Sequence, residues 1–319
     1  MSFDRSKWIW MNGRPVRWDD AQVHISAHAL HYGTGVFEGI RCYETEEGPA
    51  VFRLEEHIAR LFDSAVIHGI DIPYTAVQLE EAVCETIALN EFEACYVRPI
   101  CFFGSGVLGL DPRACRLEVA ILTWPWSPLL GNESVVTGVR VTISPWVKLH
   151  SSMLPTTAKA CGQYLNSILA VRDALRRGYD EALLLDAAGN LAEGSGENLF
   201  VVKGGRLLTN DQDSSILMGI TRDSVIEIAR DLGYPVEIGS VTLEELLNAD
   251  EAFLTGTAAE VTPIREVDEQ PVGGGKRGSI TEQIQNVFAD VTSGRDRRYC
   301  RWLRHVETVS REYAVGSRQ

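Results

Sequence analysis

The feature that most constrains the fold is the alternation of helical and strand patterns along both halves of the chain. In the first half, residues 54–69 and 75–90 carry apolar residues at helical spacing, and residues 94–103 and 116–124 are runs typical of strands. An Asn-Gly pair between two short apolar segments predicts a hairpin over residues 8–18. The first half therefore predicts a mixed domain of helices and strands.

The second half shows the same alternation. It predicts strands at residues 138–146, 181–186, 197–203, 206–210 and 251–257, an extended segment at 262–272, and helices at 164–178, 221–233 and 280–291. We expect the helix at 221–233 to begin on its threonine and to end on its glycine. Residues 124–136 are rich in Pro, Gly and Ser, as linkers are. The fold class is thus α/β or α+β in two domains: a smaller one at 1–123, this linker, a larger one at 137–293, and a loosely held charged tail at 294–319.

Composition excludes several kinds of partner. The 319 residues are 45% hydrophobic and 23% charged, which is typical of globular domains with real cores. The net charge of −14 argues against nucleic acid or anionic membrane as a partner. Apolar runs are too short for a membrane helix, and the first ten residues lack the pattern of a signal peptide, so we expect a cytoplasmic protein. Seven scattered cysteines without a CxxC pair predict reduced thiols rather than disulfides or zinc ligands.

One lysine stands in an unusual setting. Only five of the 30 basic residues are lysines (Lys7, Lys148, Lys159, Lys203 and Lys276), and Lys159 is the single charge in a run of small and uncharged residues. A desolvated amine has a lowered pKa and can attack a carbonyl to form a Schiff base, as pyridoxal phosphate enzymes require. Taken alone, the stretch is better explained by a lysine that reaches out of a loop to solvent than by a lysine that forms a Schiff base.

A pyridoxal phosphate site makes further demands on the chain. The pyridine nitrogen needs a carboxylate, and Glu193 or Glu197 in a Gly-Ser turn could supply it, although both could equally be solvated acids. The phosphate needs an anion pocket, which the Gly-Ile-Thr before the helix at 221–233 and the Gly-Thr pair at 256–257 could form. Arg60 is a possible nearby cation, although an arginine on a helix is more often simply solvated.

Seven segments together resemble one family. HALHYGTGVFEGIRCY, HIARLFDSA, YVRP, PTTAKACGQYLNS, EGSGENLF, GITRD and TGTAAEVTPI occur in the order and spacing of the branched-chain amino acid aminotransferases, which are pyridoxal phosphate enzymes of fold type IV. The resemblance runs from about residue 8 to residue 293. It implies a transaminase that moves the amino group of branched-chain L-amino acids to 2-oxoglutarate, giving 2-oxo acids and L-glutamate.

The resemblance also implies roles for single residues. Lys159 would bind the cofactor covalently and carry the proton between the amino acid and the cofactor, Tyr164 would contact the ring's phenolic oxygen, and Glu193, rather than Glu197, would pair with the pyridine nitrogen. The residues that would hold the phosphate are Arg60, Ile220, Thr221 and Thr257. Those that would bind substrate are Tyr32, Phe37, Tyr96, Arg98, Leu108, Leu110, Trp126, Thr257 and Ala258, with Arg98 reading the distal carboxylate of glutamate.

Some positions depart from the family's pattern. Leu129 replaces a tyrosine on the pocket wall, the loop at 103–112 differs in layout, and ACGQY replaces a more usual Gly-Gly-Asn before the tyrosine. These departures concern the substrate range, so we keep bulkier or aromatic L-amino acids as further donors. The family also implies a homodimer or a higher oligomer with shared sites.

Alternatives remain at this stage. Other reactions on the same scaffold are those of D-amino acid transaminases, amine transaminases and aminodeoxychorismate lyase, and a non-catalytic binding subunit is a further possibility. His28 and His31 could share a helix face as metal ligands, but no partner has suitable spacing, so we expect structural roles and no metal. The sequence lacks the usual dinucleotide, nucleoside triphosphate and serine hydrolase motifs.

Overall fold

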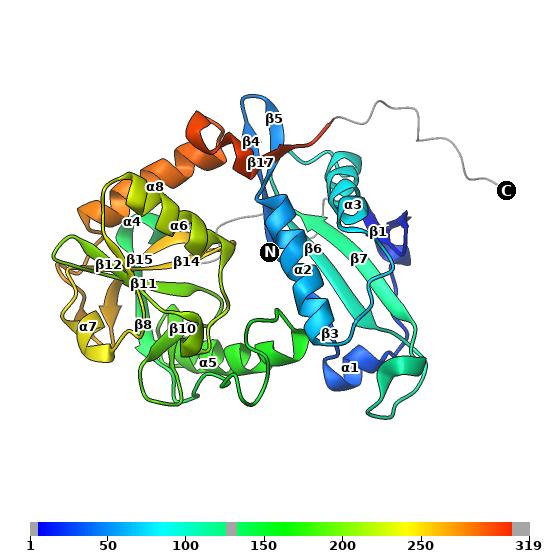
Figure 1. Ribbon diagram of the computed structural model, residues 1–319, viewed down its shortest axis with the longest axis horizontal. Helices are drawn as coiled ribbons and strands as arrows, with labels where there is room; N and C mark the ends of the chain where they lie inside the picture. The colour runs from blue at the N-terminus through cyan, green and yellow to red at the C-terminus, as the bar shows by residue number, and fades with distance from the viewer. Residues whose placement is uncertain (1–5, 126–132, 308–319) are drawn as a thin grey trace. The chain divides into compact units, whose positions relative to one another are not determined.

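The computed structural model describes residues 6–125 and 133–307. They form two compact units, each built on one sheet (Figure 1). The first unit holds the described residues up to 125 together with those from Thr292 onward, and the second holds those from residue 133 to Val291. Within these ranges, none of the helices has the length and apolar character needed to cross a membrane.

The first unit contains a sheet in which every described strand pair is antiparallel. Within the described ranges its eight strands follow the order β17-β5-β4-β6-β7-β1-β2, with β3 beside β6. The strands are β1 (Trp8–Met11), β2 (Arg14–Arg17), β3 (Gly35–Phe37), β4 (Ile40–Thr45), β5 (Gly48–Phe52), β6 (Cys95–Phe103), β7 (Leu117–Trp124) and β17 (Leu303–His305). Asn12 and Gly13 both have positive φ between β1 and β2, so the predicted hairpin is confirmed.

Two long helices lie beside each other against this sheet (Figure 1). They are α2 (Leu54–Ile67) and α3 (Ala76–Leu89), as the periodicity predicted. Thr75 and Gln78 form a reciprocal capping box at the start of α3. The unit's short helices are α1 (His28–Tyr32), η1 (Trp18–Asp20), η2 (Pro112–Ala114) and η5 (Arg297–Trp302).

Part of the expected charged tail is an ordered piece of the first unit. The segment η5 buries Tyr299 and Trp302, and Trp302 packs edge-on against Phe52 with ring centroids 5.8 Å apart. β17 then pairs with β5 at the edge of the sheet. The arginines dominate this segment in sequence, but its two buried aromatic rings decide where it lies.

The second unit contains a mixed sheet. Its nine described strands follow the order β10-β9-β8-β15-β14-β11-β12-β13, with β16 beside β15. They are β8 (Val139–Ile143), β9 (Glu181–Leu185), β10 (Leu191–Gly194), β11 (Asn198–Lys203), β12 (Arg206–Thr209), β13 (Val236–Ile238), β14 (Glu251–Gly256), β15 (Glu260–Val267) and β16 (Gln270–Pro271). The pairs β8–β9, β8–β15 and β12–β13 are parallel.

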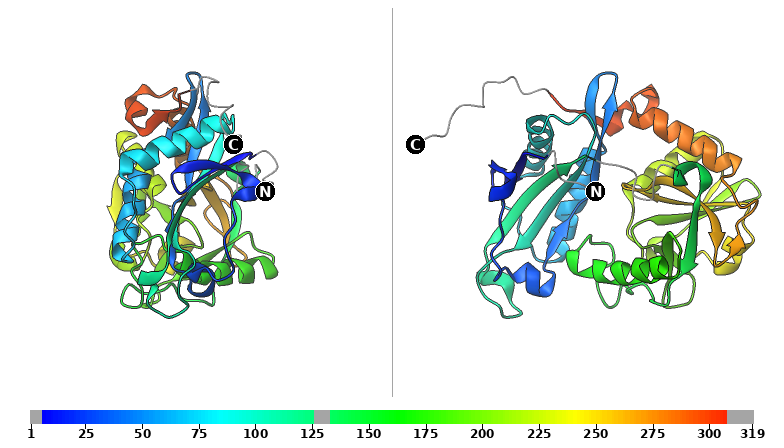
Figure 2. Two further views of the ribbon diagram at one scale, coloured as in Figure 1. Left: turned by 90° about the vertical axis from the view of Figure 1, so that its right-hand side faces the viewer. Right: turned by 180° about the vertical axis from the view of Figure 1, so that it is seen from behind.

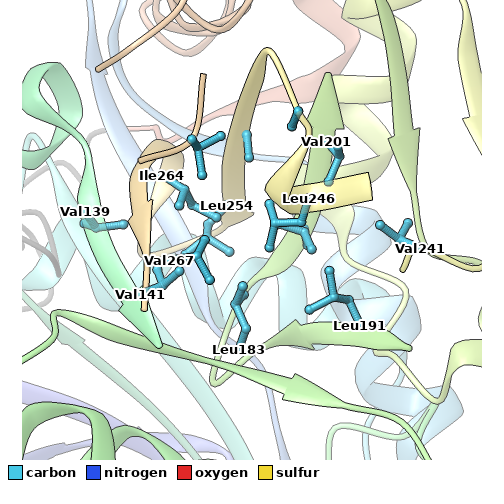
Figure 3. Packing of buried hydrophobic residues seen from close by; sticks show 14 residues of the cluster. Val139, Val141, Leu183, Leu191, Val201, Val241, Leu246, Leu254, Ile264 and Val267 are labelled. Atoms are coloured by element: carbon cyan, nitrogen blue, oxygen red, sulfur yellow. The ribbon is translucent and has the colours of Figure 1, made fainter. Parts of the chain in front are cut away.

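Helices cover both faces of the second sheet. They are α4 (Ser134–Thr137), α5 (Tyr164–Arg176), α6 (Ile220–Asp231), α7 (Leu243–Leu247) and α8 (Ser279–Thr292), with η3 (Cys161–Gln163) and η4 (Gln212–Ser214) (Figure 2). On one face, Leu246 of α7 joins a buried cluster with Leu183, Val201 and Leu254 (Figure 3). On the other, Leu184 of β9 packs against α5. This second face carries the polar residues described below.

The start of α6 differs from the sequence-based expectation. The helix begins at Ile220, its N-cap residue is Gly219, and no side chain caps it. The prediction that the helix begins on Thr221 is wrong, because Thr221 already lies inside the first turn. A glycine N-cap leaves the helix start without a side-chain acceptor for its N–H groups.

Candidate active site

A β-bulge sets the direction of Glu193. Leu191 lies opposite Leu185, but Glu193 lies opposite Leu184, so the pairing of β10 with β9 shifts by one residue. Leu191 belongs to the apolar cluster of Figure 3, and without the bulge Glu193 would face the same side. The bulge instead places Glu193 on the face of Leu184, where α5 packs.

Three groups contact the Glu193 carboxylate, which is buried. The Lys148 ammonium lies 2.5 Å from Oε1, while Asn198 Nδ2 and the Leu217 N–H donate to Oε2 at 3.0 and 3.1 Å. Asn198 Nδ2 also donates to the Leu217 carbonyl at 2.8 Å. The acid is therefore held by a cation and two hydrogen bonds, as a buried carboxylate requires.

Lys159 pairs with Tyr164, the first residue of α5. Lys159 Nζ donates a hydrogen bond to the Tyr164 hydroxyl at 2.7 Å, and both side chains are half-buried. Asn166, near the start of α5, accepts from the Leu149 N–H at 3.3 Å and donates to the Val147 carbonyl at 3.1 Å. These bonds fix the irregular segment before Lys159 to the start of α5.

The start of α6 lies beside Asn198. A side chain at Gly219 would meet Asn198 Oδ1 at far less than contact distance, so any larger residue would force Asn198 or the helix start to move. Ile220 and Thr221 are buried in the first turn. Asn198 thereby joins Glu193 to the beginning of this helix.

Arg222 of α6 binds the helix to the end of β12. Its guanidinium is buried and donates to the Asn210 carbonyl at 2.6 Å and to Thr209 Oγ1 at 3.3 Å. Burial lowers the pKa of Arg222. Because Thr209 pairs with Phe200 across β12 and β11, these bonds hold the helix on the face that also carries Asn198.

Thr257 and Ala258 lie in the turn between β14 and β15, and both are half-buried. Gly256, directly before them, is bordered by the Gly196 carbonyl and by Glu197 Cγ, which lie 3.3 and 3.5 Å from where a Cβ would stand. The turn that follows Glu193 and the turn at Thr257 are thus adjacent.

Glu197 is a buried carboxyl in the same region. Burial raises its pKa well above the ordinary value, and the negative charge of buried Glu181 adds to this effect. The charge of Lys159 acts on it in the opposite direction, so Lys159 is within electrostatic reach of this turn. The second unit therefore gathers Lys159, Tyr164, Glu193, the start of α6 and the turn at Thr257.

Arg60 of the first unit belongs to a buried polar cluster. Its Nε and Nη2 donate to both oxygens of Glu38 at 2.7 and 2.9 Å, and His57 Nδ1 lies 2.7 Å from Oε2. Glu38 is buried, which alone would raise its pKa, but the Arg60 charge and the bonds from His57 and Arg60 outweigh burial and hold the pKa far below its ordinary value. The bidentate pair fixes the plane of the Arg60 guanidinium.

Arg98 lies among aromatic rings of the same unit. Its guanidinium carbon is 4.6 Å from the ring centre of Phe37, 5.4 Å from that of Tyr96 and 5.8 Å from that of Trp124. Arg98 Nε is buried and has no hydrogen-bond partner among the described residues. Gly39 makes room for this arrangement, because a Cβ there would collide with the Tyr96 hydroxyl. The site combines apolar ring surfaces with a cation.

Tyr32 and the loop at 103–112 are linked. The Tyr32 hydroxyl donates to the Leu108 carbonyl at 2.8 Å, while Leu108 and Leu110 are exposed. His28 Nε2 lies 2.7 Å from the Gly109 carbonyl, and His31 Nε2 lies 3.0 Å from the Ile25 carbonyl. Both histidines thus make hydrogen bonds that hold backbone segments.

Trp126 and Leu129 lie outside the described residues. Three residues that contact predicted site residues were not themselves predicted from the sequence: Glu38, Lys148 and Asn198. His57, which contacts Glu38, was not predicted either. Lys148 carried a signal, since lysines are rare in this chain. Glu38 and Asn198 stand inside the segments that carry the resemblance, but no periodicity reveals their partners.

Comparison with known proteins identifies the family. The profile of the amino-transferase class IV family matches residues 35–267. The chain is 43% identical over 299 residues to a branched-chain-amino-acid aminotransferase of Pseudomonas aeruginosa, and the match covers 94% of this chain and 97% of that protein. The chain therefore belongs to the class IV aminotransferases.

Solved structures agree in fold. The crystal structure of the Escherichia coli branched-chain amino acid aminotransferase matches with a TM-score of 0.93 at 44% identity, covering 95% of this chain and 100% of that one. A T.th. branched-chain amino acid aminotransferase complexed with N-(5'-phosphopyridoxyl)-L-glutamate matches with a TM-score of 0.91 at 44% identity, covering 95% and 99%. The predicted fold type IV architecture is confirmed.

Proposed function

We propose that this chain is a pyridoxal phosphate-dependent transaminase that moves the amino group of branched-chain L-amino acids to 2-oxoglutarate. The products are 2-oxo acids and L-glutamate. The observation that carries the proposal is the hydrogen bond between Lys159 and Tyr164. In the same unit, the bulge in β10 places Glu193 on the sheet face where α5 packs. The relatives named above support branched-chain amino acids as the donors.

The residues of the second unit fit pyridoxal phosphate. The aldehyde of the cofactor requires an amine, which Lys159 supplies. Its phenolic oxygen requires a hydrogen-bonding group such as the Tyr164 hydroxyl, and its ring nitrogen requires a carboxylate such as that of Glu193. The uncapped start of α6, with Gly219 fitted against Asn198, offers an anion site for the phosphate. The relative solved with phosphopyridoxyl-glutamate supports the same cofactor.

When bound, pyridoxal phosphate supplies a carbonyl that accepts the amino group and a ring that withdraws electrons. Lys159 would hold the cofactor covalently and would then move the proton from the substrate's α-carbon. Tyr164 would keep the Lys159 amine in place through the 2.7 Å hydrogen bond. Glu193 would hold the ring nitrogen's proton, and Ile220, Thr221 and Thr257, together with Arg60, would hold the phosphate.

Substrate would be bound by aromatic side chains, by Arg98 and by the turn at Thr257. Phe37, Tyr96 and Tyr32 would accept an aliphatic side chain, and Arg98 would bind the distal carboxylate of glutamate or of 2-oxoglutarate. Arg98 can do this because its Nε is buried without a partner in the described part of the chain, and because a guanidinium binds carboxylates bidentately. Thr257 and Ala258 would bind the substrate's α-carboxylate, and Leu108 and Leu110 would line the site.

Oligomeric state and location are part of the proposal. We infer at least a homodimer with shared sites, which sedimentation of the purified protein tests. A cytoplasmic location agrees with the seven cysteines, all of which lie in the described ranges and are free thiols.

The activity test uses a panel of amino donors. Protein supplied with pyridoxal phosphate, leucine and 2-oxoglutarate should form glutamate, and isoleucine and valine should do the same. Phenylalanine tests the extension to aromatic donors, while D-alanine and 1-phenylethylamine test other reactions of this scaffold. Lys159→Ala should abolish glutamate formation, and Lys203→Ala, at an exposed lysine of the same unit, should retain it. No glutamate from any L-amino acid would refute the proposal.

A further inference from the structure

Lys148 is a largely buried cation that lies against a buried carboxylate. Its ammonium lies 2.5 Å from Glu193 Oε1, and the two side chains are only 15% and 7% exposed. Lys148 has no role in the activity proposed above. Its partner Glu193, however, is the acid that the proposed function pairs with the ring nitrogen of the cofactor.

The backbone around Lys148 is fixed. The Lys148 N–H donates to the Leu185 carbonyl of β9 at 2.8 Å, and the Leu149 N–H donates to Asn166 of α5 at 3.3 Å. Glu193 lies opposite Leu184, the neighbour of Leu185 in β9. The same strand therefore holds both partners, and the ion pair follows from the register of the sheet.

Among the residues that the structure describes, Lys148 is the one cation within ion-pair distance of Glu193. Glu193 also interacts electrostatically with Arg222 of α6 and with Glu197 in the turn after β10. Its direct contacts from neighbouring elements are the neutral donors Asn198 and the Leu217 N–H, both on Oε2. Lys148 is thus the ion-pair partner of Oε1, and a buried carboxylate without a paired cation is costly.

We propose that Lys148 is the counter-ion that holds the Glu193 carboxylate in place before the cofactor binds, and that it then shares this carboxylate with the ring nitrogen. The inference rests on the proposed function for the second part of this role. Lys148 is a positioning residue, because it acts on the cofactor through Glu193.

The expected effects follow from distance. Coulomb attraction between Lys148 and Glu193 acts at 2.5 Å. A cationic ring nitrogen that contacted the same carboxylate would be repelled by the ammonium, and at about twice the distance this repulsion would offset about half of the attraction. Lys148 therefore stabilises the cofactor-free protein more than the cofactor-bound protein, and its removal should tighten the binding of pyridoxal phosphate.

The first test needs no cofactor. The stability of the cofactor-free protein to urea is compared for Lys148→Met, Glu193→Gln, the double variant and Lys203→Met as a surface control. We expect Lys148→Met to be strongly destabilised, the double variant to be more stable than Lys148→Met, and Lys148→Arg to recover most of the loss. A double variant less stable than Lys148→Met would overturn the pairing, and this comparison holds even if Lys148→Met alone unfolds.

The second test titrates pyridoxal phosphate into the same proteins and follows its absorption band. We expect about tenfold tighter binding to Lys148→Met than to the wild type. We expect no such difference in the Glu193→Gln background, because glutamine would not keep the ring nitrogen protonated and the second cation would not form. Weaker or unchanged binding to Lys148→Met, or an equal change in both backgrounds, would overturn the sharing of Glu193. A wild type that binds no pyridoxal phosphate would instead contradict the proposed function and leave the first test standing.

Discussion

Replacing Glu38 by glutamine tests how the buried cluster of the first unit is held together. Glutamine keeps the shape of the side chain but removes the negative charge that Glu38 presents to Arg60, whose side chain is 14% exposed. Removing one partner of a buried ion pair costs about 3–5 kcal/mol. We therefore expect Glu38→Gln to lower the free energy of unfolding at pH 7 by about 3 kcal/mol.

The pH dependence of this loss has a definite sign. The pKa of Glu38 is lowered in the folded protein from an ordinary value of 4.5, so its contribution is complete above pH 4.5 and is lost as the pH falls towards the folded value. Between pH 4.5 and pH 3 the wild type should lose about 1.5 kcal/mol that the glutamine variant does not lose. The difference between the two proteins should therefore shrink by that amount.

Urea unfolding at pH 7, 4.5 and 3 measures both effects. Glu56→Gln is the matched control, because Glu56 pairs with Arg53 on the same helix but is 43% exposed, and it should cost less than about 1 kcal/mol. If Glu38→Gln were no more destabilising than the control, or if its cost grew at low pH, the reasoning about the cluster would be refuted.

Three further predictions concern single contacts. Gly219→Ala should weaken the binding of pyridoxal phosphate about tenfold in a fluorescence titration, because the new Cβ forces Asn198 or the start of α6 to move; unchanged binding would contradict this. Arg98→Met should raise the KM for 2-oxoglutarate about 50-fold in steady-state assays and the KM for leucine much less, since only the former has a distal carboxylate; equal changes would count against this role. Thr75→Ala should remove the capping box with Gln78 and cost about 1 kcal/mol in urea unfolding without changing glutamate formation.

Long periodic segments could be predicted from the sequence. The apolar spacing of α2 and α3 and the β-branched runs of β6 and β7 identify these elements, because each buries one continuous face. The short strands β3, β4 and β5 went unpredicted. Each has only three to six residues, and glycines interrupt the stretch that contains them.

Part of the candidate site could also be predicted from the sequence. Residue types and their order suggested Lys159 and the acids at 193 and 197, because the chemistry needs an amine and a carboxylate. The direction of Glu193 depends on a bulge in β10, which no local pattern reveals. Its partner Lys148 is 45 residues away in sequence and reaches it only through the register of β9. Glu38 likewise meets Arg60 only once β3 and α2 are packed.

The central claim is that Lys159 is the amine that holds the cofactor. Borohydride reduction of the protein with bound pyridoxal phosphate, followed by digestion and peptide mass spectrometry, tests it directly. The account predicts the phosphopyridoxyl mass on Lys159 alone among the five lysines, and its loss when leucine is added before the reductant. The same mass on Lys148 or another lysine, with Lys159 unmodified, would contradict the account.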